Sequence, residues 1–159
     1  MSIDDAADES IDFGVLLNLA FGVFKAQLHE ELERVGFDDI GPAFGYVFRL
    51  LSTRPVILRE LAQALGMSAP GALKIVNEMI EKGYVERSGH ATDARQKLLS
   101  LTARGRKAMK AAHRFHQRFE ATLAARFGDA EAAAARRVLE GIVEAGRRDP
   151  GQPLTAMPR

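Results

Sequence analysis

The feature that most constrains the fold is a segment between residues 58 and 101, in which two short helical patterns precede two short strand patterns. Apolar residues recur at helical spacing over residues 58–65 and 69–82, and a tight three-residue turn separates the two stretches. Strand-like stretches at 84–87 and 97–101 then flank a polar loop that contains glycine. Two short helices joined by such a turn and followed by a hairpin predict a winged helix-turn-helix.

Further helices are expected on both sides of this segment, which makes the predicted fold mainly α. Helical spacing predicts a helix over residues 11–35, one over 103–127 and a last helix that ends near residue 146. A shorter helix over 42–51, with a proline near its start, precedes the winged segment. The apolar face of residues 13–24 is too wide for an ordinary surface helix. We therefore expect this helix to be buried on several sides, in its own core or against a partner chain.

Composition and targeting signals limit the setting of the protein. The chain contains no cysteine, which excludes disulfides, thiolate metal ligands and a cysteine nucleophile and fits a reducing cytoplasm. Residues 1–10 are acidic and lack the basic-then-apolar order of a signal peptide. The most apolar stretch, residues 13–24, is shorter than a membrane span. We expect a cytoplasmic protein that does not associate with a membrane.

Enzyme and metal functions find little support in the sequence. We recognise no Ser/His/Asp order, phosphate-binding glycine loop or pair of buried carboxylates, so we expect neither catalysis nor a cofactor. His113, His116 and Glu120 recur at i, i+3 and i+7 along one helix, a spacing that a metal site can use. Because arginines flank these histidines, an ordinary surface is the more frequent explanation, and we expect no metal.

Charge is distributed unevenly along a chain whose net charge is only +1. Residues 54–110 carry 11 Lys and Arg against 5 Asp and Glu, whereas residues 1–53 carry 3 against 10. A basic middle is typical of a surface that faces phosphates. Taken alone, this charge fits an ordinary solvated face equally well.

The second helix of the helix-turn-helix needs small or hydrogen-bonding residues on its outward face if it is to enter the major groove. Ser68 is suited to cap this helix, and Pro70 and Gly71 in its first turn allow the backbone to approach DNA closely. Lys74 can donate to a guanine or a phosphate, whereas Glu78 is expected to face solvent or be paired. The candidate DNA-binding residues of this helix are Ser68, Pro70, Gly71, Lys74 and Asn77.

The hairpin is expected to supply a second DNA contact. An arginine carried by such a loop can enter the minor groove, where narrow A·T-rich stretches concentrate negative potential. Asp93 lies two residues before Arg95, and a carboxylate there can hold the guanidinium in one orientation. The candidate DNA-binding residues of the hairpin are Arg87, His90, Asp93, Arg95 and Lys97.

The run DARQKLLSLTARG, residues 93–105, resembles the wing signature of the MarR family: Asp-x-Arg, alternating leucines, then Leu-Thr and a glycine. The upstream run LRELAQALGMSAPGALKIVNEMIEKGYVER, residues 58–87, is similar to the family's helix-turn-helix. Ile57 departs from the pattern because it replaces the usual Ser or Thr cap, and Leu73 and Ile80 replace polar residues of the recognition helix. These departures affect the expected base contacts more than the fold.

The resemblance implies a ligand-responsive repressor that binds a pseudo-palindromic operator as a homodimer. It also implies an effector pocket lined by phenylalanines, although a packed aromatic core explains the same residues equally well. A winged-helix module that binds protein instead of DNA is the alternative, and the basic middle argues against it. The candidate pocket residues are Phe13, Phe21, Phe24, Phe44 and Phe48.

The resemblance also gives an expected domain organisation. A winged helix is expected at about 38–102, between dimerisation helices at about 11–35 and 103–147. The N-terminus and the proline-rich C-terminal tail are expected to be flexible. The expected segments are therefore 1–10, 11–147 and 148–159.

Overall fold

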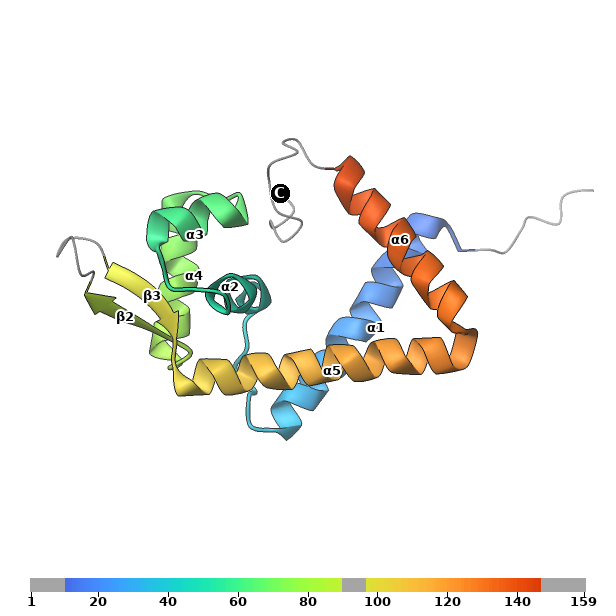
Figure 1. Ribbon diagram of the computed structural model, residues 1–159, viewed down its shortest axis with the longest axis horizontal. Coiled ribbons are helices and arrows are strands. Elements are labelled where there is room, and N and C mark those ends of the chain that lie inside the picture. Colours follow the sequence, from blue (N-terminus) through green and yellow to red (C-terminus); the bar gives the residue numbers. More distant parts are fainter. Residues whose placement is uncertain (1–10, 90–96, 147–159) are drawn as a thin grey trace, which may run out of the picture. The chain divides into compact units, whose positions relative to one another are not determined.

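The computed structural model describes residues 11–89 and 97–146. Between Asp38 and Asp39 the chain divides into two compact units, and each is described by itself. Figure 1 labels the helices and most of the strands.

The first unit consists of helix α1, Phe13–Arg34, and the turn that ends it. Gly36 has a φ of 90°, and the N–H groups of Gly36 and Phe37 donate to the carbonyls of Glu33 and Leu32 at 2.9 and 2.8 Å. This is a Schellman ending, which favours glycine because other residues rarely adopt that backbone conformation. Leu32 and Phe37 are buried. The large apolar residues exposed along α1 are Phe13, Val15, Leu16, Leu19, Phe21 and Val23.

The second unit contains a helix-turn-helix, a small sheet and two longer helices. In Figure 1, β3 leads into the start of α5, the lower end of α4 lies nearby, and α6 follows from the far end of α5. The elements in chain order are α2 (Phe44–Leu51), β1 (Val56–Ile57), α3 (Leu58–Leu65), α4 (Ala69–Glu81), β2 (Val85–Gly89), β3 (Lys97–Leu101), α5 (Ala103–Phe127) and α6 (Asp129–Ala145).

The turn between α3 and α4 is defined by local caps. Gly66 ends α3 in the left-handed conformation with a φ of 66°. The side chain of Ser68 caps α4 by accepting a hydrogen bond from the Gly71 N–H at 3.2 Å. At the start of α3, Ile57 offers no side-chain cap, but its N–H donates to the carboxylate of Glu60 at 3.2 Å.

The three strands form an antiparallel sheet in the order β1-β3-β2. In the hairpin, Val85 pairs with Leu101 and Arg87 with Leu99. The sequence did not predict β1, because a strand of two residues is too short to show an alternating pattern.

The core of the second unit lies between the helix-turn-helix, the sheet and α2. Phe44, Phe48 and Tyr84 pack with their rings edge to face, with centroids 5.7–6.3 Å apart. The largest fully buried side chains are Tyr84, Phe44, Leu61, Leu65, Met79, Leu99, Val47, Val76 and Val85. The predicted stripes of α3 and α4 are the faces that pack into this core.

Helix α5 begins directly after the sheet, and Thr102 caps it by accepting from the Gly105 N–H at 3.0 Å. Gly128, with a φ of 102°, separates α5 from α6. Arg136 of α6 forms an ion pair with Glu120 of α5 at 2.6 Å. None of the residues of α6 is buried, and the large apolar ones are Val138, Leu139, Ile142 and Val143.

The observed elements confirm the predicted fold class, a mainly helical winged helix-turn-helix. The helix and strand bounds differ from the predicted ones by one or two residues at most. Within the described ranges, no helix has both the length and the apolar character that crossing a membrane requires. The expected domain organisation stays a prediction, and its two flexible ends fall outside the described residues.

Candidate nucleic-acid interface

Helix α4 has one face fixed in the core and one open to solvent. Ala72, Val76 and Met79 recur at i, i+4 and i+7 and are fully buried. Pro70, Lys74 and Asn77 have the same spacing and are exposed. The helix therefore presents a short row of mostly polar side chains while its inner face holds it rigidly, as a helix that enters a DNA groove requires.

The first turn of α4 is compact. The hydroxyl oxygen of Ser68 accepts from the Gly71 N–H, and this hydrogen bond holds the first turn of the helix in place. A Cβ atom at Gly71 would lie 3.2 Å from both the Ser68 Oγ and the Met67 Cε. Glycine thus keeps the start of the helix narrow, which allows a phosphate or a base edge to approach the backbone closely.

The last turn of α4 carries a charge pair. Glu78 forms an ion pair with Lys82 at 2.7 Å, which agrees with the interpretation that Glu78 is paired. The same Lys82 ammonium group donates to the backbone carbonyl of Asp39 at 2.9 Å. The positive charge of Lys82 therefore balances much of the negative charge that Glu78 places beside the exposed row.

A side-chain hydrogen bond joins strand β2 of the hairpin to the outer face of α4. The Nη2 of Arg87, on β2, donates to the Oδ1 of Asn77 at 2.6 Å, and both side chains are exposed. Both residues are candidate DNA contacts in the sequence, where Arg87 belongs to the hairpin and nothing connects it to Asn77. The structure places them together.

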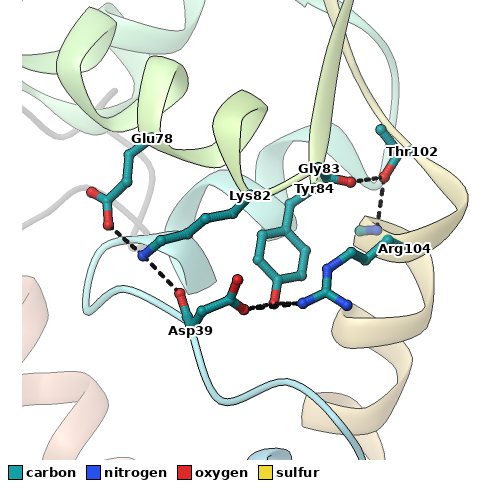
Figure 2. Close-up of polar contacts among 8 residues, drawn as sticks. Asp39, Glu78, Lys82, Gly83, Tyr84, Thr102 and Arg104 are labelled. Carbon is teal, nitrogen blue, oxygen red and sulfur yellow. Dashed lines mark hydrogen bonds and ion pairs between the residues drawn. The ribbon is translucent and has the colours of Figure 1, made fainter.

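A polar cluster connects the loop before α2, the start of β2 and the start of α5 (Figure 2). The Tyr84 hydroxyl donates to the carboxylate of Asp39. The Arg104 Nη2 donates to the same carboxylate at 3.2 Å and to the Tyr84 hydroxyl oxygen at 3.1 Å, with its guanidinium carbon 4.8 Å from the centre of the Tyr84 ring. Because Tyr84 directly precedes β2, this cluster fixes the base of the hairpin.

The cluster changes the titration of its members. Burial and the hydrogen bond to Asp39 raise the pKa of the Tyr84 hydroxyl to about 12. Desolvation is also the largest single effect on Asp39 and acts to raise its pKa, but the hydrogen bond from Tyr84 and the charge of Arg104 outweigh it. The pKa of Asp39 is therefore lowered, and the carboxylate stays charged at neutral pH.

Thr102 holds the junction between the sheet and α5 through its side chain and its backbone. The Thr102 hydroxyl donates to the Gly83 carbonyl at 2.5 Å, and the Thr102 N–H donates to the Tyr84 carbonyl at 3.0 Å. A Cβ atom at Gly105 would lie 2.1 Å from that same carbonyl oxygen. The Leu-Thr and glycine of the wing signature thus have a structural reason, because only glycine lets α5 approach β2 this closely.

The loop of the hairpin holds the remaining predicted contacts. His90, Asp93 and Arg95 lie outside the described residues, so their predicted roles stay predictions. Lys97 is exposed at the start of β3, where it pairs with Gly89.

The phenylalanines of the predicted effector pocket have two kinds of environment. Phe44 and Phe48 are buried against Tyr84 in the second unit, as expected for a packed aromatic core. Phe13 and Phe21 of α1 are exposed, and Phe24 is half-buried. These residues belong to two separate units, and the pocket stays a prediction.

His113 and His116 lie on α5 as predicted. Desolvation lowers the pKa of His116, with the charge of Glu120 acting against it. Over residues 11–89 and 97–146, no group of three potential ligands is arranged to hold a metal ion.

Two features of this region were not predicted from the sequence. Arg54 pairs with Glu60 at 3.3 Å, and Glu60 in turn takes the place of the missing cap at Ile57. A glutamate three residues after the cap position was a visible signal for this contact. The cluster of Asp39 with Tyr84 and Arg104 had no such signal, because its members lie 45 and 65 residues apart in the chain.

Comparisons with known proteins agree with this geometry. Residues 39–96 match the family model described as MarR family. The chain is 37% identical over 60 residues to the HTH-type transcriptional regulator BilQ of Clostridium symbiosum (strain WAL-14163). This match covers 37% of the chain and 42% of BilQ, so less than half the length of this curated relative is matched.

Solved structures share the fold over most of the chain. A MepR–DNA complex from S. aureus has a TM-score of 0.68 at 20% identity, covering 86% of this chain and 99% of MepR. FabT of Streptococcus pneumoniae in complex with DNA has a TM-score of 0.66 at 22% identity, covering 84% and 96%. A mutant MarR from E. coli, complexed with operator DNA, has a TM-score of 0.63 at 21% identity, covering 81% and 91%. At these identities the likeness concerns the fold.

Proposed function

Because residues 39–96 match the family model described as MarR family, we propose that the protein is a cytoplasmic, sequence-specific, DNA-binding transcriptional regulator and not an enzyme. The observation that carries the proposal is helix α4. Its inner face is fully buried, its outer row of Pro70, Lys74 and Asn77 is exposed, and a hairpin bearing Arg87 lies beside it. This is the arrangement in which a recognition helix occupies the major groove and a wing contacts the neighbouring backbone or minor groove.

Phosphate contacts supply most of the affinity in this proposal, and base contacts supply the specificity. The basic middle of the chain, residues 54–110, provides the positive charge. Lys74 is exposed on the outer row of α4, where it can donate to the O6 and N7 atoms of a guanine. Arg95, from the sequence pattern, is proposed as the minor-groove anchor of the wing.

We also propose that the protein acts as a homodimer. The apolar side chains exposed along α1 and α6 need a partner to bury them, and a second copy supplies one with the same faces. A two-fold axis would set two recognition helices one helical turn of DNA apart, roughly 34–36 Å, and make the operator a pseudo-palindrome.

The regulator is proposed to act as a repressor that a small molecule releases from DNA. A reporter gene placed behind the bound site should then be expressed less when the protein is present. Higher expression with the protein would make it an activator instead.

The proposal is tested by in vitro selection of random duplexes with the full-length protein, followed by anisotropy titrations of the selected and a scrambled duplex. The protein should bind the selected duplex more tightly than the scrambled duplex, by about 4 kcal/mol or more. Affinity for both duplexes should fall steeply with salt, because bound Lys and Arg release counterions from the phosphates.

A matched pair of lysine variants sharpens the test. Lys74→Ala should weaken binding of the selected duplex by about 1–3 kcal/mol per half-site. Lys110→Ala, an exposed site on α5, removes the same charge and should leave the preference between duplexes unchanged. Equal binding of selected and scrambled DNA, or a partner interaction that is insensitive to salt, would contradict a sequence-specific regulator.

A further inference from the structure

The hydrogen bond between Arg87 and Asn77 holds the Arg87 guanidinium beside the outer face of α4. Within the described residues, the Arg87 guanidinium makes this one side-chain hydrogen bond, from Nη2 to the Asn77 Oδ1 at 2.6 Å. A guanidinium has five N–H donors, so most of them remain free for another partner. An arginine that belongs to the hairpin by sequence is thus attached to the outer face of α4.

Strand alternation explains why Arg87 reaches the helix. Val85 and Arg87 are two residues apart on β2 and therefore lie on the same face of the sheet. That face is the inner one, because Val85 is 2% exposed and Leu99, the cross-strand partner of Arg87, is 1% exposed. Glu86 lies on the opposite face, where Ser100 donates to it. The side chain of Arg87 leaves the sheet on the side of the core and emerges beside α4.

The outer row of α4 ends at the residue that holds Arg87. Pro70, Lys74 and Asn77 succeed each other along one side of the helix at spacings of four and three residues. The Arg87 guanidinium continues this row, and it adds a planar double donor to a row that otherwise offers an ammonium and an amide. Bidentate donation by arginine to the O6 and N7 atoms of guanine is the commonest specific contact in the major groove.

We propose that Arg87 is a specificity-determining residue that reads a guanine in the major groove together with α4, and that Asn77 positions its guanidinium. This inference rests on the proposed function and names one base that the interface recognises. It assigns Arg87 to the major groove, whereas the sequence pattern grouped Arg87 with the wing, which is expected to contact the minor groove.

Asn77 acts through Arg87 in this arrangement. The Asn77 oxygen already accepts from Arg87, so this hydrogen bond sets the orientation of the amide, although the oxygen has a second lone pair. Holding the guanidinium in one place reduces the side-chain freedom that is lost when DNA binds, which favours affinity for the correct base. Asn77 is therefore a positioning residue.

The test uses the full-length protein and the duplex obtained from in vitro selection with the wild type. Each guanine of the half-site is replaced in turn by 7-deazaguanine, at the matching position of both half-sites, which keeps the base pair but removes the N7 acceptor. For the wild type, at least one of these replacements should weaken binding, by on the order of 5- to 100-fold. The Arg87→Ala variant should bind the natural and the modified duplex equally at that position, while it stays sensitive at other guanines.

The control for loss of charge is Arg126→Ala, near the end of α5. About 24 residues of helix, or roughly 35 Å, separate this site from the hairpin end of α5, and Arg126 is exposed. It should keep the full sensitivity to 7-deazaguanine. Arg87→Lys keeps the charge but should show a smaller sensitivity than the wild type, because an ammonium group does not donate in a planar fork.

Two variants test the positioning role. Asn77→Ala removes the acceptor, so the sensitivity to 7-deazaguanine should fall toward that of Arg87→Ala, and the double variant should be no weaker than Arg87→Ala alone. Asn77→Asp keeps an acceptor oxygen, so it should bind all DNA more weakly but retain the sensitivity. Thermal unfolding monitored by circular dichroism should be unchanged in every variant, because these side chains are exposed.

Three results would overturn the inference. Selection that enriches no sequence removes the proposed function and this inference with it. Enrichment followed by an Arg87→Ala variant that weakens selected and scrambled duplexes equally, with the wild-type sensitivity intact, makes Arg87 a phosphate contact and leaves the proposed function standing. Full sensitivity in Asn77→Ala shows that Asn77 does not position Arg87.

Discussion

The winged-helix region, from α2 to β3, buries its apolar side chains to a very different degree from the two helices α1 and α6. In the winged-helix region, Tyr84, Phe44 and Leu61 are at most 1% exposed. Ten large apolar residues of α1 and α6 are 43–62% exposed: Phe13, Val15, Leu16, Leu19, Phe21, Val23, Val138, Leu139, Ile142 and Val143. The first region carries its own core and a polar cluster that fixes the hairpin. The second has apolar faces whose burial, in our proposal, requires a second copy of the chain.

Stability and assembly therefore depend on different regions of the molecule. Substitutions in the winged-helix region should change the free energy of unfolding of a single chain, because its core is complete within that chain. Substitutions on the exposed faces of α1 and α6 should change association and leave the winged-helix core intact. Among the described residues, the one large exposed apolar side chain outside the ranges 11–35 and 127–143 is Leu73, on the outer face of α4.

The largest effect is expected from Gly105→Ala. The added Cβ would lie 2.1 Å from the Tyr84 carbonyl oxygen, and neither backbone segment is free to move without breaking the Thr102 contacts. Urea denaturation should show a loss of about 3 kcal/mol or more, at the upper end of what overpacking causes. Gly45→Ala on α2, where a Cβ meets nothing within 4 Å, is the matched control and should be neutral or slightly stabilising. Equal stability of the two variants would show that α5 does not pack this closely on β2.

The next prediction concerns the exposed face of α6. Leu139→Asp places a charge where the side chain is 46% exposed in one chain, so the fold of the chain should be little affected. If this face packs against a second copy, the charge should weaken the dimer by about 2 kcal/mol or more, since it leaves an unpaired charge in an apolar interface. Sedimentation equilibrium measures the dissociation constant. Arg137→Ala, an exposed change on the same helix, is the control. A wild type that stays monomeric at micromolar concentration would contradict the dimer.

A third prediction uses the raised pKa of Tyr84 to test whether the cluster is part of the core. The folded pKa of about 12 lies above the ordinary value of 10.0, so the unfolded chain loses this proton first as the pH rises. The contribution of this hydroxyl to the free energy of unfolding is therefore fully present below pH 10. It is lost between about pH 10 and 12, which lowers the free energy of unfolding by about 2–3 kcal/mol. The Tyr84→Phe variant should be less stable than the wild type at neutral pH, but its free energy of unfolding should not show this decline between pH 10 and 12. Tyr46→Phe should decline like the wild type, and the same decline in all three proteins would show that Tyr84 is not involved.

The sequence predicted the elements because their signals are local. The apolar spacing of α3 and α4, the Ser68 and Thr102 caps and the left-handed Gly66 all involve residues within a few positions of each other. These signals gave the helix-turn-helix and the hairpin to within two residues. The cap at Ile57 looked deficient, yet Glu60 supplies it from three residues away.

The contacts that the sequence did not predict join residues that the fold brings together. Asn77 and Arg87 were both candidate DNA contacts, but they lie on different elements, and the register of β2 decides that they meet. Asp39 gave no signal at all, because its partners are distant in the chain. Local pattern identifies the elements and the exposed row, whereas strand register and packing decide which side chains act together.

The smallest expected effect is at Leu73, the exception in the comparison of the two regions. Leu73 is 38% exposed on α4, between the residues of the outer row, so it contributes little to the core of the single chain. An apolar side chain on the outward face of a recognition helix suits the methyl group of a thymine. Leu73→Ala should therefore weaken binding of the selected duplex by about 1 kcal/mol per half-site, the lower end of what one base contact supplies, with no change in thermal stability. Replacing thymines of the half-site by uracil removes only the methyl group and should give the same loss for the wild type at one position. At that position the variant should not distinguish the two bases. A Leu73→Ala variant that lowers the melting temperature by many degrees, or that keeps the preference for thymine over uracil, would assign Leu73 to packing and not to the DNA surface.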